Sequence, residues 1–115
     1  MPSVIFPGPE GRLEGRFSPP PRPRAPAAVI LHPHPEGGGT MNDRIVQRLY
    51  QTFSDRGFAT LRFNFRGVGR SQGSFDSGVG ELSDAASALD WVQSIHPEAK
   101  QTWVAGYSFG ALMGM

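Results

Sequence analysis

The sequence lacks cysteine, a surplus of one charge sign and any long apolar run, and each absence excludes a class of function. With no Cys among 115 residues, disulfides, zinc–thiolate sites and cysteine nucleophiles are excluded. The 11 Lys and Arg balance 10 Asp and Glu to a net charge of +1, whereas nucleic-acid binders neutralise phosphates with a basic surplus. No run approaches the roughly 18 apolar residues of a membrane-spanning helix, so we expect neither nucleic acid nor membrane as a partner.

Glycine and proline are plentiful instead, at 15 and 11 residues, and their positions organise the chain. Residues 1–17 predict a hairpin whose turn contains the Gly and Pro residues at 7–11. Residues 18–26 hold five prolines and predict an extended connection, with a polyproline ligand for a partner domain as the alternative. The first residues have no basic stretch followed by an apolar one, so we expect no secretory signal and a cytoplasmic location.

From residue 27 the pattern alternates between buried strands and amphipathic helices. The apolar segment 27–31 predicts a strand buried on both faces, and further strands are expected at 58–65 and 101–107. Strand–helix–strand order predicts an α/β fold with a parallel sheet and helices on both faces, so 27–115 forms the core of one domain, 1–115. The first helix is expected to begin after Asn42 or Asp43 and to end at Gly57. The second is expected to end at His96, before Pro97, and a third to start at Ser108. Their predicted apolar stripes are Ile45, Val46, Leu49 and Phe53 in the first, and Leu82, Ala85, Ala86, Leu89 and Val92 in the second.

The segment 106–110 reads Gly-Tyr-Ser-Phe-Gly, a G-x-S-x-G pattern between a predicted strand and a predicted helix. A serine nucleophile needs a sharp strand-to-helix turn that exposes its Oγ, and glycines two residues away on each side prevent collisions. Gly106 and Gly110 stand at those positions, so we predict Ser108 as a nucleophile. The backbone N–H of Phe109, at the helix start, would stabilise an oxyanion. The competing interpretation is an ordinary turn with a solvent-facing serine.

The segment 32–39 reads His-Pro-His-Pro-Glu-Gly-Gly-Gly and directly follows the first core strand. Acyl transfer needs a second oxyanion donor, usually a backbone N–H of this loop. Pro33 and Pro35 have no N–H, which makes His34 the candidate donor. A metal site on His32 and His34 is the alternative, because histidines at a strand end form a common ligand pair. No third ligand stands at a recognisable spacing, so we predict no metal.

A third Gly-rich loop, 64–73, follows the second core strand. Its glycines at 67, 69 and 73 do not match the dinucleotide fingerprint G-x-G-x-x-G, so the loop is not expected to bind a nucleotide, and no cofactor is implied. Ligands collect at the carboxyl ends of parallel strands. The position of the loop therefore predicts that it borders the site.

Four segments in this order carry a resemblance: His-Pro-His-Pro at 32–35, Gly-Gly-Thr-Met-Asn at 38–42, Asn-Phe-Arg-Gly-Val-Gly-Arg-Ser at 64–71, and the pattern at 106–110. Together they resemble the amino-terminal half of a small bacterial alpha/beta-hydrolase, close to the dienelactone-hydrolase-like members. The resemblance implies a three-layer alpha/beta-hydrolase fold and an acyl-enzyme on Ser108. The substrate it implies is a small molecule with an ester, thioester or related acyl bond. The site residues it implies are the nucleophile Ser108, the oxyanion donors His34 and Phe109, the elbow glycines Gly106 and Gly110, and a pocket rim of His32, Arg66 and Gly67.

In that family the acid and the histidine base follow the nucleophile. Only seven residues follow Ser108, and none is Asp, Glu or His. We therefore expect a domain truncated after the nucleophile elbow, which by itself is inert toward esters. The strand at 101–107 would then be an apolar sheet edge, so self-association is expected. A non-catalytic binding module on the same scaffold is the alternative from another class of function.

Overall fold

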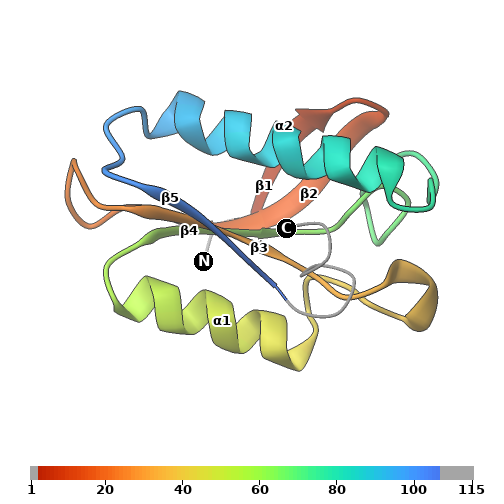
Figure 1. The fold of residues 1–115 in the computed structure, drawn as a ribbon, viewed down its shortest axis with the longest axis horizontal. Helices are drawn as coiled ribbons and strands as arrows, with labels where there is room; N and C mark the ends of the chain where they lie inside the picture. Colours follow the sequence, from red (N-terminus) through yellow and green to blue (C-terminus); the bar gives the residue numbers. More distant parts are fainter. Residues whose placement is uncertain (1–2, 107–115) are drawn as a thin grey trace.

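The structure is a computed structural model that describes residues 3–106, so the turn and helix expected from Ser108 onward lie outside the described residues. Its elements alternate as the sequence predicts, and Figure 1 shows α1 on one face of the sheet and α2 on the other. In chain order they are β1 (Ser3–Gly8), β2 (Gly11–Ser18), β3 (Ala27–Leu31), the short 3-10 helix η1 (Pro35–Gly37), α1 (Arg44–Asp55), β4 (Ala59–Phe63), α2 (Val79–Ile95) and β5 (Thr102–Gly106).

The five strands form one mixed sheet in the order β1-β2-β4-β3-β5. Strands β3, β4 and β5 are parallel, while β1 and β2 form an antiparallel hairpin that pairs with β4. No strand or helix interrupts the Pro-rich segment 19–26, because proline lacks the N–H that a sheet ladder needs. The predicted α/β fold class with a parallel core is confirmed.

The central strand β3 is buried along its whole length, which explains its uninterrupted apolar sequence. Its side chains alternate between two clusters. Ala27, Val29 and Leu31 join the larger cluster under α2, whereas Ala28 and Ile30 pack with Val46 and Tyr50 of α1.

Helix α1 begins where the sequence predicts. The Asp43 side chain caps it by accepting hydrogen bonds from the N–H groups of Ile45 and Val46. The chain leaves the helix through Gly57, whose φ of +86° suits glycine. Of the predicted stripe, Val46 is buried, whereas 47% of Ile45 is exposed.

The prediction of the apolar stripe on α2 is wrong for two of its five residues, Leu82 and Ala86. Leu82 is 53% exposed and Ala86 is exposed too, while Glu81 and Asp84 are fully buried. The helix presents these carboxylates inward because both have hydrogen-bond donors in the preceding loop. Their buried companions on this helix are Gly80, Ala85, Ala88 and Val92.

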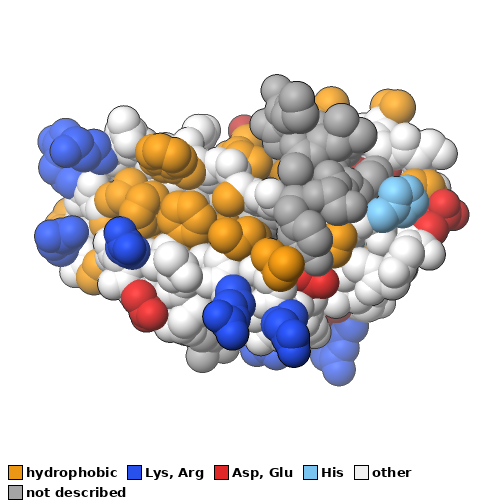
Figure 2. Space-filling model, turned by 60° about the horizontal axis from the view of Figure 1, so that its bottom comes forward, with side chains coloured by type: hydrophobic (Ala, Val, Ile, Leu, Met, Phe, Trp, Pro, Cys, Tyr) orange, Lys and Arg blue, Asp and Glu red, His pale blue; other side chains and the backbone are white. Residues whose placement is uncertain are grey.

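Strand β5 forms an edge of the sheet built by the described residues. Trp103 is 52% exposed and Val104 is 37% exposed. Figure 2 brings this side of the molecule into view and shows hydrophobic side chains gathered in a band across it. Among the described residues, no helix is both long and apolar enough to span a membrane.

Candidate functional site

The three loops selected from the sequence leave the sheet at one edge. Strands β3, β4 and β5 run parallel, so the segments that follow them begin at the same end of the sheet. The pairing of Leu31 with Gly106 brings the start of the His32 loop beside the end of β5. Gly106 is the last described residue of the G-x-S-x-G segment; Ser108, Phe109 and Gly110 lie outside the described residues.

His32 is fully buried directly after the end of β3. Its ring nitrogens connect two loops. Nε2 accepts a hydrogen bond from the Phe65 N–H at 3.1 Å, and Nδ1 lies 2.7 Å from the Pro33 carbonyl oxygen. A backbone N–H can only donate and a carbonyl can only accept, so the ring is the neutral tautomer with its proton on Nδ1.

Burial also lowers the pKa of His32 below its ordinary value of 6.5, with an opposing effect from the hydrogen bond to Pro33. The neutral ring therefore persists at neutral pH. Both nitrogens are occupied by backbone groups, so this ring has no lone pair to offer a metal ion or a serine hydroxyl. No group of three or more His, Asp or Glu residues within 3–106 is arranged to hold a metal.

His34 is exposed and begins the short helix η1. Its Nδ1 accepts a hydrogen bond from the Glu36 N–H, while its carbonyl accepts from the N–H groups of Gly37 and Gly39. Gly39 packs so closely that a Cβ there would collide with the Pro33 carbonyl. The compact loop therefore requires glycine at position 39. A Cβ at Gly37 would meet open space, so glycine is not required there for reasons of space.

Arg66 is also buried, with 6% of its area exposed. Its guanidinium forms a two-pronged ion pair with Asp84 of α2, with Nη2–Oδ1 3.0 Å and Nε–Oδ2 3.1 Å. The Arg66 backbone N–H also donates to Asp84, at 2.9 Å. The side-chain hydrogen bonds to Asp84 raise the pKa of the Arg66 guanidinium above its ordinary value, and burial opposes them. The neighbouring Gly67 is exposed, with a φ of +74°.

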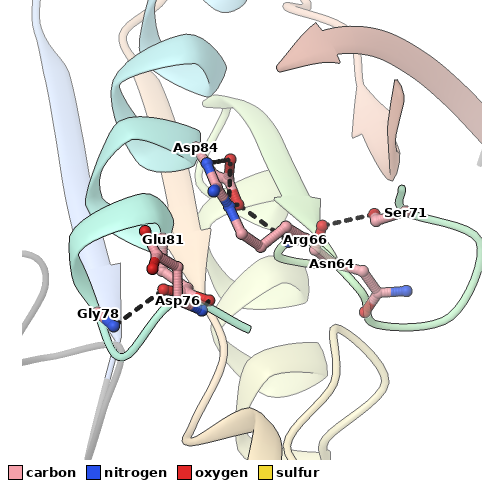
Figure 3. A network of polar contacts seen from close by, with 7 residues as sticks. All are labelled: Asn64, Arg66, Ser71, Asp76, Gly78, Glu81 and Asp84. Atoms are coloured by element: carbon pink, nitrogen blue, oxygen red, sulfur yellow. Dashed lines mark hydrogen bonds and ion pairs between the residues drawn. The ribbon is translucent and has the colours of Figure 1, made fainter. Parts of the chain in front are cut away.

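A second buried carboxylate, Glu81, orders the loop that leads into α2. Its two oxygens accept hydrogen bonds from the N–H groups of Asp76 and Gly78, each at 2.9 Å. Figure 3 shows Glu81 and Asp84 projecting from α2 toward the loop that contains Arg66. Gly80 makes room for the guanidinium, since a Cβ there would collide with Arg66. The network fastens the loop after β4 to α2.

Sequence reasoning missed Asn64, which links three parts of the chain. Its Oδ1 accepts from the Met41 N–H at 2.8 Å, and its Nδ2 donates to Glu14 of the hairpin at 3.0 Å. Ser71 Oγ donates to the Asn64 carbonyl and accepts from the Glu14 N–H. The only signal in the sequence was a polar residue at the end of an apolar strand, because these partners lie 23 and 50 positions away from Asn64.

Comparison with known proteins identifies the family to which this chain belongs. The profile of the X-Pro dipeptidyl-peptidase (S15 family) matches residues 12–115. The chain is similar to the Agrobacterium tumefaciens protein ATU1826, described as a candidate alpha/beta hydrolase of unknown function. The two share 68% sequence identity and a TM-score of 0.97 over 99% of this chain and 52% of that one. An alpha-beta serine hydrolase homologue from Coxiella burnetii has 41% identity and a TM-score of 0.91, over 98% of this chain and 54% of that one.

Among curated proteins, the chain is 51% identical to the uncharacterized protein RP471 of Rickettsia prowazekii, over all of this chain and 48% of RP471. The chain thus spans about half the length of these relatives. The sheet, the helices on its two faces and the strand-end loops have the arrangement of alpha/beta serine hydrolases. The chain belongs to the X-Pro dipeptidyl-peptidase (S15) family of hydrolases.

Proposed function

We propose that this protein is a serine hydrolase that cleaves an ester, thioester or related acyl bond through an acyl-enzyme on Ser108. The observation that carries the proposal is the pairing of Leu31 with Gly106. Ser108 follows Gly106 by two residues, and His34 follows Leu31 by three, so both start from the same edge of the sheet. A nucleophile and an oxyanion donor must lie within about 3 Å of one reacting carbonyl, and adjacent parallel strand ends favour that geometry.

In this mechanism the Ser108 Oγ attacks the acyl carbon and the carbonyl oxygen becomes an oxyanion. The N–H groups of His34 and Phe109 donate hydrogen bonds to that oxygen, which stabilises the tetrahedral intermediate. A general base takes the Oγ proton during the attack and gives it to the departing alcohol or thiol as the intermediate collapses to an acyl-serine. Water then hydrolyses this ester, which releases the acid and restores the Ser108 hydroxyl. His32 is not the base in this scheme, since its two nitrogens are held by Pro33 and Phe65.

The general base and its carboxylate partner are not supplied by residues 109–115, which contain no His, Asp or Glu. Without a base the serine hydroxyl is a weak nucleophile. We therefore propose that residues 1–115, expressed by themselves, do not hydrolyse p-nitrophenyl acetate faster than a Ser108→Ala variant. Turnover above that variant would contradict this part of the proposal.

The class of bond that the protein cleaves is best identified with the protein purified from its native source. We propose a small-molecule acyl substrate of the dienelactone-hydrolase-like kind, and the family's own description suggests X-Pro peptides as the competing class. Short p-nitrophenyl esters, an acyl thioester and an Ala-Pro p-nitroanilide distinguish the three bonds. Ester or thioester hydrolysis lost with Ser108→Ala supports the proposal, and cleavage of the anilide alone replaces it with peptidase activity.

Two further proposals concern the cellular location of the protein and its self-association. We propose a cytoplasmic location, which cell fractionation tests. We also propose that residues 1–115 self-associate along β5, because this edge strand contains no charged residue and exposes Trp103 and Val104.

A further inference from the structure

The peptide group between Pro33 and His34 is held by its carbonyl. The His32 Nδ1–H donates to the Pro33 oxygen at 2.7 Å, so this carbonyl points toward the buried imidazole. The described residues contain no cis peptide bond, and in a trans peptide the N–H points away from the carbonyl. The His34 N–H therefore points to the side of the peptide opposite the His32 ring.

We infer that His32 is a positioning residue: its imidazole turns the Pro33 carbonyl inward and thereby aims the His34 N–H as an oxyanion donor. The inference rests on the proposed function, because it gives His32 a task in the same site. This role differs from the metal ligand and the pocket-rim residue considered from the sequence. His32 acts through the 33–34 peptide and touches no reacting atom.

The ring can aim the peptide because it is itself fixed. Its Nε2 accepts from the Phe65 N–H just beyond β4, and its plane packs edge-on against the Phe65 ring at a centroid distance of 4.7 Å. Parallel pairing of β3 with β4 fixes the two strand ends relative to each other. The imidazole thus holds the 33–34 peptide in a fixed position relative to the sheet: its Nε2 accepts from Phe65, and its Nδ1–H donates to Pro33.

The far side of the peptide is fixed as well. The His34 carbonyl accepts hydrogen bonds from the N–H groups of Gly37 and Gly39, both at 3.0 Å. These bonds define the turn of η1 and hold the next peptide unit. With the Pro33 carbonyl held on one side and the His34 carbonyl on the other, the N–H between them has little freedom to rotate.

Two substitutions separate the two hydrogen bonds of His32. In His32→Asn the side-chain amide N–H replaces Nδ1–H and can still donate to Pro33, but nothing replaces Nε2. In His32→Gln the amide oxygen reaches the place of Nε2 and can still accept from Phe65, but the donor to Pro33 is lost. The inference predicts that Asn preserves the aim of the His34 N–H and that Gln does not.

The experiment is NMR spectroscopy on uniformly ¹⁵N-labelled residues 1–115 and the two variants. In the wild type, the imidazole ¹⁵N shifts at pH 7 are expected to show the neutral Nδ1–H tautomer of His32. Residual dipolar couplings report the direction of the His34 N–H relative to the sheet. The expected result is a coupling unchanged in His32→Asn and shifted in His32→Gln, by more than the spread of couplings along β3.

An Nε2–H tautomer, a charged ring at pH 7, or a His34 coupling that is the same in wild type and His32→Gln would overturn the inference. If the variants do not fold, the tautomer of His32 in the wild type is the test: Nδ1–H supports the inference and Nε2–H overturns it. None of these readouts uses turnover. A failure of the proposed function appears separately, as hydrolysis that survives Ser108→Ala.

Discussion

Replacing Arg66 with methionine tests whether the buried ion pair with Asp84 holds the strand-end loop to α2. The substitution keeps an apolar stem of similar length and removes the guanidinium. It leaves Asp84 fully buried, beside the equally buried Glu81, and within residues 3–106 the Arg66 backbone N–H is then the one donor that remains to Asp84. Removing one partner of a buried pair costs about 3–5 kcal/mol, because the remaining charge is left uncompensated.

That cost is large compared with the roughly 5–15 kcal/mol that stabilises a domain of ordinary size. Urea unfolding followed by circular dichroism should show the Arg66→Met midpoint falling sharply, with the slope unchanged. Arg70→Met is the matched control, since Arg70 is an exposed arginine of the same loop whose backbone N–H is held by Glu14. Its free energy of unfolding should stay within about 0.5 kcal/mol of the wild type.

The double variant Arg66→Met/Asp84→Leu separates lost charge pairing from lost packing. Apolar replacement of both partners of a buried pair is often neutral, so part of the lost stability should return. Recovery should stop short of the wild type by about 1–3 kcal/mol, because the Arg66 backbone N–H then loses its acceptor. The reasoning is refuted if Arg66→Met unfolds at the same urea concentration as Arg70→Met.

The remaining predictions concern pH, a single glycine and the sheet edge. Burial lowers the pKa of His32, so the unfolded chain takes up its proton first: the free energy of unfolding should hold above pH 6.5 and fall as the pH drops below it. Urea titrations at several pH values measure this dependence in the wild type and in His32→Gln. The free energy of unfolding should change less with pH in His32→Gln, and the same change in both proteins would contradict the prediction. Gly39→Ala should lower the thermal midpoint by several degrees through a collision with Pro33, whereas Gly37→Ala should leave it unchanged. Light scattering should show Trp103→Lys, at the edge strand, reducing self-association, while Leu82→Lys, equally exposed on α2, does not; a monomeric wild type would end that proposal.

Much of the fold follows from local signals in the sequence. The apolar run of β3, the Asp43 cap and the glycine at 57 each predict a structure through contacts within a few residues. Parallel order then brings the strand-end loops to one edge, and the pairing of Leu31 with Gly106 is the consequence. The general place of the site could be predicted for this reason.

The interior of the site could not be predicted in the same way. A helix stripe read from hydrophobicity alone assigns Leu82 to the core and Glu81 to solvent, whereas the structure has the reverse. The carboxylates are buried because their donors, Arg66 and the N–H groups of the preceding loop, come to them from other positions of the chain. His32 presents the same difficulty, since its partner Phe65 lies 33 positions away.

The most direct test of the proposed serine hydrolase is covalent labelling of the protein from its native source with a fluorophosphonate, followed by mass spectrometry of its peptides. The proposal predicts that the phosphonyl group is found on Ser108 and that labelling disappears in Ser108→Ala. Residues 1–115 by themselves should react far more slowly, because residues 109–115 supply no base. Labelling that is absent from Ser108 in an otherwise active protein would contradict the proposed nucleophile.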